Sequence, residues 1–322
     1  MSVPIRDRRA LLTSSLGTFL LLTGCAVPWQ SEDASALGGK ITIGFVNGGS
    51  TEFHTCLQES VERTARNNSV GLHTANSRQD AATEVANIER LIAQDVDALI
   101  VQTVDVEALN AGIAKATAAG VPIFLTSVVP KDTADILGAV VVDLKEVGRL
   151  DAEWIEKDAT GRQVSVGVIA GAPGAASDVL VDSFSENLPG NATVVASRPG
   201  MYDPAKASIV AAEMIRAQPG LDYAFVANEQ MAFAARKAFD AAGAKDVRIV
   251  TVNGTDEALA ALKDGRFAAT VSNSAADTGE LAVENVVSLL RQERADKIDK
   301  TRIRLVTEDN ADTAPLYCPP ED

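Results

Sequence analysis

The chain has 322 residues and a formal net charge of −15, from 29 Lys and Arg against 44 Asp and Glu. A surface this acidic repels phosphates and gains nothing from counterion release, which excludes nucleic acid as a partner. The chain is longer than a domain with one hydrophobic core usually is, and its length suits two domains of common size.

The first 24 residues predict a secretion signal. Arg6, Arg8 and Arg9 precede an apolar run over residues 11–22, and Leu22-Thr-Gly-Cys25 resembles a bacterial lipobox. Residues 1–24 would then be removed and Cys25 would take up a lipid, anchoring an extracytoplasmic protein to the cell membrane. An ordinary signal, leaving a soluble secreted protein, is the alternative. The Arg8-Arg9 pair also resembles a twin-arginine signal, so the export route stays open.

Residues 25–39 are rich in Ser, Ala, Gly and acidic side chains without apolar periodicity, which predicts a flexible tether. From residue 40, short β-branched runs alternate with segments of helical period, the pattern of parallel sheets with crossover helices. We expect strands at 41–46, 70–74, 97–101, 122–126, 164–169, 193–197, 223–226, 247–252 and 268–271, and helices that include 52–66, 81–94 and 106–119. The alternation restarts after residue 143, so the fold class is α/β with two doubly wound parallel-sheet lobes.

Two cysteines remain once Cys25 is assigned to the lipid. An oxidising compartment permits a disulfide between Cys56 and Cys318, which would pin the C-terminal tail against the first helix. One buried and one exposed free thiol is an equal alternative, because the sequence does not fix the distance between them.

Ligands of open parallel sheets sit beyond the carboxyl ends of the strands. The polar residues at these places are uncharged, and most are amides, which donate and accept hydrogen bonds as sugar hydroxyls do. For any single one of them, a helix cap or a turn is the competing interpretation. The six are Asn47, Gln102, Ser127, Asn228, Asn253 and Asn273.

Aromatic residues stand at strand-to-helix junctions in a chain with only 4% aromatic residues. Phe53, His54 and Tyr202 offer flat faces for the apolar side of a sugar ring. Phe53 in the core and His54 on the surface are the competing interpretations.

Several fragments together resemble the ribose and galactose type of periplasmic binding protein. They are Ile43-Gly-Phe-Val-Asn47 with Phe53-His54, Asp97-Ala-Leu-Ile-Val-Gln102, Ala119-Gly-Val-Pro122, Asn228-Glu-Gln-Met231 and Val252-Asn-Gly-Thr255. The resemblance spans residues 40 to about 310. It implies two lobes joined by three hinge strands, which close on one ligand and deliver it to an ABC importer.

The resemblance also implies lobe boundaries and ligand contacts. The first lobe would be 40–143 plus 274–302, and the second 144–273 plus 303–322. Carried over by position, the ligand contacts fall on Asn47, Phe53, His54, Gln102, Ser127, Asp178, Tyr202, Asn228, Asn253 and Asn273.

This chain departs from the family pattern at its charged positions. Ser127-Val128 stands where the family sets an Asp-Arg pair, Asp178 where it sets an arginine, and Asn253 where it sets an aspartate. Arginine forks are what would grip a ligand carboxylate. We therefore expect a neutral sugar or polyol, or alternatively an amine-bearing ligand, and poor binding of acidic sugars.

Catalysis requires a nucleophile with its base, a metal cluster or a close carboxylate pair, and the sequence indicates none of these. His54 and His73 lack metal-ligand spacing, and Gly171-Ala-Pro-Gly174 has neither a P-loop nor a dinucleotide fingerprint. We expect a monomeric binding protein without cofactor, which serves an ABC permease. A sensor subunit for a membrane receptor is the alternative.

Overall fold

The computed structural model describes residues 40–104 and 106–320. The expected signal peptide (1–24), the tether (25–39) and the lipidated Cys25 lie outside the described residues. Within the described part of the chain, no helix has the length and the apolar content of a membrane span.

The first lobe is built on a six-stranded parallel sheet with the order β11-β5-β4-β3-β1-β2. Its strands are β1 (Thr42–Asn47), β2 (Gly71–Asn76), β3 (Ala98–Gln102), β4 (Ile123–Ser127), β5 (Gly138–Val141) and β11 (Ile298–Lys300). Its helices are α1 (Glu52–Asn67), α2 (Ala81–Ile92), α3 (Val106–Ala119) and α9 (Ala275–Leu290).

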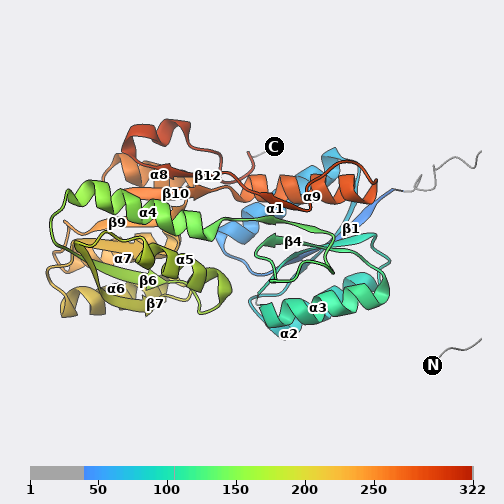
Figure 1. The fold of residues 1–322 in the computed structure, drawn as a ribbon, viewed down its shortest axis with the longest axis horizontal. Helices are drawn as coiled ribbons and strands as arrows, with labels where there is room; N and C mark the ends of the chain where they lie inside the picture. The colour runs from blue at the N-terminus through green and yellow to red at the C-terminus, as the bar shows by residue number, and fades with distance from the viewer. Residues whose placement is uncertain (1–39, 105, 321–322) are drawn as a thin grey trace, which may run out of the picture. The chain divides into compact units, whose positions relative to one another are not determined.

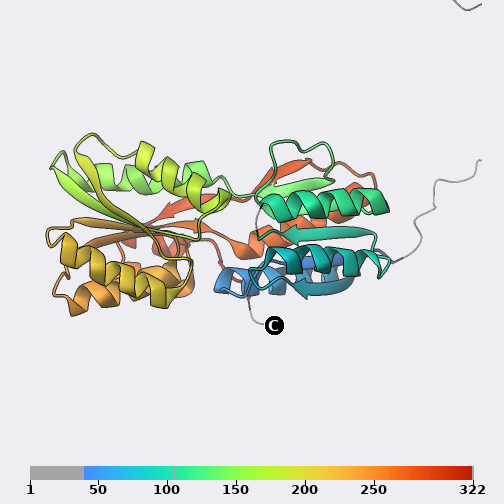
Figure 2. The same ribbon diagram turned by 90° about the horizontal axis from the view of Figure 1, so that it is seen from below.

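Both faces of this sheet are covered, which explains the nearly continuous apolar runs of its strands. In β3, Ala98 and Ile100 pack into the cluster under α1 and α9, whereas Leu99 and Val101 pack into the cluster under α2 and α3. Figure 2 shows α2 and α3 side by side on their face of the sheet. The period of two in the strand thus divides one apolar run between two cores.

The second lobe contains another six-stranded sheet, with the order β12-β10-β9-β8-β6-β7 and only β12 antiparallel to its neighbour (Figure 1). Its strands are β6 (Val164–Ala170), β7 (Ala192–Pro199), β8 (Tyr223–Val226), β9 (Arg248–Asn253), β10 (Ala269–Asn273) and β12 (Ile303–Val306). Its helices are α4 (Leu144–Ala159), α5 (Ala175–Glu186), α6 (Pro204–Ala217), α7 (Glu229–Ala241), α8 (Asp256–Lys263) and the 3-10 helix η1 (Glu308–Thr313).

Three segments carry the chain from one sheet to the other. They join β5 to α4, β10 to α9 and β11 to β12, and each leaves the carboxyl end of a strand. Lys300, the last residue of β11 before the third segment, lies 2.9 Å from Asp143 in the first, so an ion pair links the two crossings at this point. Because all three depart from carboxyl ends, the edge of each sheet that carries the candidate ligand residues is the edge next to the crossings.

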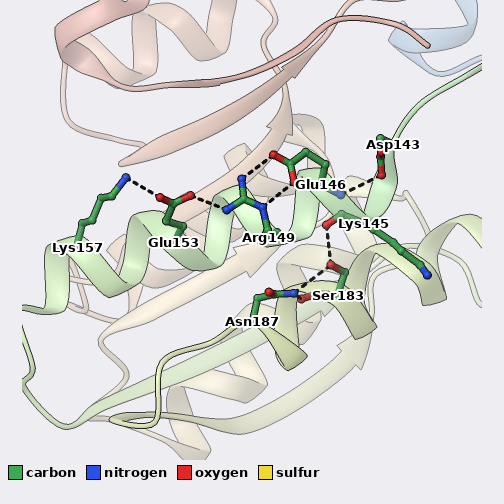
Figure 3. Close-up of polar contacts among 8 residues, drawn as sticks. All are labelled: Asp143, Lys145, Glu146, Arg149, Glu153, Lys157, Ser183 and Asn187. Atoms are coloured by element: carbon green, nitrogen blue, oxygen red, sulfur yellow. Dashed lines mark hydrogen bonds and ion pairs between the residues drawn. The ribbon is translucent and has the colours of Figure 1, made fainter. Parts of the chain in front are cut away.

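Helix α4 begins directly after the first crossing, and its exposed side carries a chain of ion pairs (Figure 3). Asp143 caps the helix by accepting the Glu146 N–H, and Arg149 joins Glu146 to Glu153. Such surface pairs each contribute only a few tenths of a kcal/mol, about 0.3–0.5 kcal/mol for an i,i+4 pair. Their function is local: they favour the helix at the position where the chain enters the second lobe.

The C-terminal tail contacts both lobes. The sequence analysis assigned residues 303–322 to the second lobe and left open a disulfide that would hold the tail against the first helix. Ala311 of η1 packs into the core of the second lobe. Tyr317 is buried in the core of the first lobe, and its carbonyl accepts the Ala276 N–H at the start of α9. Cys318 forms a disulfide with Cys56 on α1. The tail is therefore a fourth connection between the lobes.

The disulfide closes a loop over a sequence separation of 262 residues. We expect that replacing Cys56 and Cys318 by Ala lowers the free energy of unfolding by about 2–5 kcal/mol, because the unfolded chain regains the entropy of that loop. Denaturant unfolding with and without a reducing agent measures the difference. The double variant is the control, since reductant should leave it unchanged; an unaltered wild-type midpoint under reduction would contradict the prediction.

Candidate functional site

Asn47 ends β1 and offers an open acceptor in the first lobe. Its side-chain nitrogen donates to the His54 carbonyl at 2.8 Å and to Gln58 Oε1 at 3.3 Å. Its Oδ1 is buried and has no hydrogen-bond partner among the described residues. A buried amide oxygen without a partner is costly, so this atom is suited to a ligand hydroxyl or to a water held in its place.

Gln102 ends β3 and Ser127 ends β4, the neighbouring strand. The Gln102 Oε1 accepts the Thr126 hydroxyl at 2.6 Å and the Ser127 hydroxyl at 2.9 Å. Because the oxygen is occupied, the amide nitrogen of Gln102 is the group left to donate to a ligand. Ser127 has a φ of 72°, the left-handed conformation that few residues other than glycine adopt without strain.

His54 lies in the first turn of α1 and is buried, which excludes the surface interpretation. Its Nδ1 lies 2.7 Å from the Thr51 hydroxyl, and its ring meets Phe53 edge-on with 5.8 Å between centroids. Burial lowers the pKa of His54 to about 4, so the ring is neutral at physiological pH. Gly48 permits this packing, because a Cβ there would come 2.8 Å from the Gln102 carbonyl oxygen. Asn47, His54, Gln102 and Ser127 thus form one group.

In the second lobe, Asn228 is the N-cap of α7. Its Oδ1 accepts the Met231 N–H at 2.9 Å, so the side-chain oxygen of Asn228 is a helix cap, as the competing interpretation expects. Asn228 is buried. Its amide NH2 stays available as a donor at the same strand end.

Asn253 and Asn273 end β9 and β10, which are neighbours in the second sheet. Asn253 has a φ of 138°, and the next two N–H groups, of Gly254 and Thr255, donate to the Glu229 carboxylate. Asn273 is buried at the second crossing, where its Oδ1 lies 3.5 Å from the Thr301 hydroxyl of the third crossing. The position of Asn273 is therefore tied to the hinge itself.

Tyr202 and Asp178 form a separate group near the carboxyl end of β6. The Tyr202 ring packs on Gly171, where a Cβ would come 2.1 Å from the ring, and burial raises the pKa of its hydroxyl. Asp178 is exposed on the first turn of α5. It shares a surface hollow of about 340 Å³ with Arg198, a cation that the sequence analysis missed.

The structure therefore brings the candidates together in groups, one in the first lobe and others along the second sheet. It also adds Glu229, a buried carboxylate that the sequence analysis quoted only as part of a motif. The sequence feature that could have identified Glu229 is its place directly after Asn228 at the start of a helix. An acidic residue there is usually explained by its favourable interaction with the helix dipole. Within the described residues no cluster of His, Cys, Asp and Glu could hold a metal ion.

The neutral, buried His54 makes stability depend on pH. Its folded-state pKa of about 4 lies below the ordinary 6.5, so the unfolded chain binds the proton more tightly and stability falls as pH falls from 6.5 to 4. We expect the wild type to lose on the order of 3 kcal/mol more than His54→Asn over this range, measured by denaturant unfolding. His73→Asn, on an exposed part of β2, is the matched control. If the free energy of unfolding falls equally with pH in the wild type and in His54→Asn, the prediction is contradicted.

Comparison with known proteins agrees with this geometry. The ribose import binding protein RbsB of Bacillus subtilis (strain 168) is 27% identical over 303 residues, which cover 92% of this chain and 97% of that protein. The xylitol-binding protein of Mycolicibacterium smegmatis is 25% identical, and the match covers 94% of this chain and 88% of that protein. The periplasmic component of the arabinose ABC transporter of Shewanella sp. ANA-3, solved with L-arabinofuranose, is 27% identical, with a TM-score of 0.78 over 84% and 93% of the two chains.

The same fold and the same plan of two α/β lobes therefore recur in proteins that bind solutes for transport. The family model for the periplasmic binding protein domain matches residues 43–294. Members of this family are substrate-binding components of transport that act outside the cytoplasm, and are not enzymes. With both lobes covered by the match, the chain belongs to the periplasmic binding protein family.

Proposed function

We propose that this protein is a lipid-anchored solute-binding protein that captures one neutral sugar or polyol between its lobes and delivers it to an ABC importer. The observation that carries the proposal is the set of uncharged amides at the carboxyl ends of both sheets, each with one hydrogen-bonding half still open. Asn47 supplies an acceptor, and Gln102 and Asn228 supply donors. Hydroxyls, which donate and accept at once, match this mixture.

The positions of the crossings support capture between the lobes. Because the chain leaves each sheet at carboxyl ends, the strand ends with Asn47 and Gln102 in one lobe and Asn228 and Asn253 in the other border the same hinge. A ligand that contacts both groups favours the closed arrangement over the open one by the free energy of the second set of contacts.

The relatives indicate a small sugar or polyol. Names and titles of some describe the five-carbon ribose, xylitol and L-arabinofuranose, and those of others the six-carbon galactofuranose and fructose. We propose a five-carbon ligand, because two relatives that match more than 90% of this chain are named for ribose and xylitol. His54 and Tyr202 would cover its apolar faces, since both rings are largely buried and uncharged near neutral pH.

Attachment to the membrane rests on the sequence. Cys25 follows a charged start and an apolar run, and the acidic composition suits a monomer held outside the cell. An ABC permease in the same membrane would be its partner.

An amine-bearing ligand is a second candidate because Asp178 is exposed beside Tyr202. Arg198 faces the same hollow and partly offsets that carboxylate, so the neutral ligand is the better supported. An amino sugar in the ligand panel separates the two: tighter binding than its neutral parent would favour the second candidate.

Removing the open amide groups should weaken binding. Asn228→Ser keeps an oxygen that can cap α7 but loses the amide donor, and Asn253→Gly removes a side chain while accepting a φ of 138°. Each variant should bind the preferred member of a panel of ribose, arabinose and xylitol about tenfold more weakly in calorimetry, since a buried hydrogen bond contributes on the order of 1 kcal/mol.

Asn68→Ala is the matched control for those two variants. Asn68 follows α1 at its C-terminal end, and its side chain bonds only the helix carbonyl of Thr64. Normal affinity in Asn228→Ser and Asn253→Gly, with the panel bound by the wild type, would show that the ligand sits elsewhere.

Acidic sugars should bind poorly. The amides of the candidate site are neutral, and Asp178 already offsets the nearby Arg198, so the carboxylate of glucuronic or galacturonic acid would gain little compensation for its lost hydration. Thermal-shift measurements should show no stabilisation by either acid at concentrations at which the neutral sugar raises Tm. Stabilisation by a uronic acid equal to that by its neutral parent would overturn this expectation and would indicate that Arg198 binds the carboxylate.

A further inference from the structure

Glu229 accepts three hydrogen bonds although it is almost fully buried, with 1% of its surface exposed. Its Oε1 accepts the Gly254 N–H and the Thr270 hydroxyl, both at 2.6 Å, and its Oε2 accepts the Thr255 N–H at 2.9 Å. A carboxylate can accept about four hydrogen bonds, so three donors satisfy most of its capacity. The donors come from two places in the chain: the loop after β9, and strand β10.

These contacts join three strands whose ends carry candidate ligand residues. Glu229 follows Asn228 directly, Gly254 follows Asn253 directly, and Thr270 lies on β10, the strand that ends at Asn273. Gly254 is packed tightly against β10, because a Cβ there would come 2.7 Å from Ser272 Oγ. One carboxylate therefore connects the backbone of all three segments.

The backbone that Glu229 holds is strained. Asn253 has a φ of 138° and Gly254 a φ of 83°, conformations that L-residues other than glycine rarely adopt. A non-glycine residue in such a conformation persists only where the surroundings determine it strongly, and such residues concentrate at ligand sites. The two N–H bonds from Gly254 and Thr255 are the contacts that fix the chain directly after Asn253.

We propose that Glu229 is a positioning residue for ligand capture, which holds Asn253 in its strained conformation and sets its distance from Asn228. The inference rests on the proposed function, because it assumes that these two amides contact the ligand. Glu229 itself touches no ligand in this scheme; it acts through the loop 253–255.

A neighbouring carboxylate shows that burial alone does not produce this arrangement. Asp151 on α4 is also fully buried, yet neither of its oxygens has a hydrogen-bond partner among the described residues. Burial raises the pKa of Asp151 well above its ordinary value and raises that of Glu229 to about 7. Asp151 makes no such hydrogen bonds among the described residues, whereas Glu229 bonds the loop after β9 and strand β10 and directly follows Asn228.

The test compares three variants of the full chain. In Glu229→Gln, the amide NH2 replaces one accepting oxygen and faces a backbone donor, so one N–H of the loop is left unpaired. Thr270→Val removes the third bond and keeps both loop bonds. Arg236→Met is the matched control: Arg236 lies on the same helix and is buried, but it bonds the carbonyls of Ala244 and Val247 at the opposite end.

Affinity is measured by calorimetry against ribose, arabinose and xylitol, and stability by Tm. We expect Glu229→Gln to weaken binding about tenfold, Thr270→Val to weaken it less, and Arg236→Met to lower Tm without changing affinity. Equal affinity losses in Glu229→Gln and Arg236→Met would reduce Glu229 to a stabilising residue and overturn the inference.

An NMR pH titration reports on the contact itself and requires no ligand. Burial and then the charge of Glu229 raise the pKa values of Asp151 on α4 and of Tyr317 in the tail, so these are the titratable groups that interact with it. In the wild type and in Asp151→Asn, the amide resonances of Gly254 and Thr255 should shift together as Glu229 ionises, with a wild-type midpoint near pH 7, and in Glu229→Gln they should not. Gly254 and Thr255 amide resonances that are the same in the wild type and in Glu229→Gln at every pH would overturn the inference.

The two failures are distinguishable. If the wild type binds no member of the panel while the two amides titrate as expected, the proposed ligand class is wrong and the loop contact stands. If the wild type binds and Glu229→Gln binds equally well, the positioning role is wrong and the proposed function stands.

Discussion

Parallel strands end together, and in this chain the segments that cross between the lobes leave from those same ends. A doubly wound sheet presents its loops and helix starts at the carboxyl edge, which is where α/β proteins place ligands. Here the edge with Asn47 and Gln102 and the edge with Asn228 and Asn253 both adjoin the crossings. The hinge therefore brings two half-sites into reach without any further element.

In the proposed function, the amides at these edges divide their hydrogen bonds between the fold and the ligand. Gln102 uses its oxygen to join β3 to β4, and Asn228 uses its oxygen to cap α7. Each then has an NH2 group whose direction is already fixed by the bond on the other side. A donor held in this way loses little rotamer freedom on binding, which favours affinity. The interpretation of such residues as caps and their interpretation as ligand contacts are therefore compatible.

Much of the fold could be predicted from the sequence because the apolar residues recur with the period of a strand or helix, and these same residues are buried. The helix over 106–119 and the strand over 223–226 were predicted with the observed bounds, and the other elements for which bounds were predicted lie within one or two residues of those bounds. For helices α4 to α9 no bounds were predicted. Strands β5, β11 and β12 were missed, since each has only three or four residues and β11 and β12 are only partly buried. Periodicity carries little information over so short a run. Glu229 was not recognised because its partners lie 25 to 41 residues away, and no local pattern encodes such contacts.

The Cys56–Cys318 bridge also determines how mechanical load would pass through the molecule. Strand β1 lies in the first lobe and Cys318 returns to the same lobe, so the second lobe lies inside a covalently closed loop. Tension applied between Lys40 and Cys318 would run through residues 40–56 and across the two sulfur atoms. The loop that contains the hinge, with a sequence separation of 262 residues, would not be stretched, so such a load would leave the two lobes free to move relative to each other.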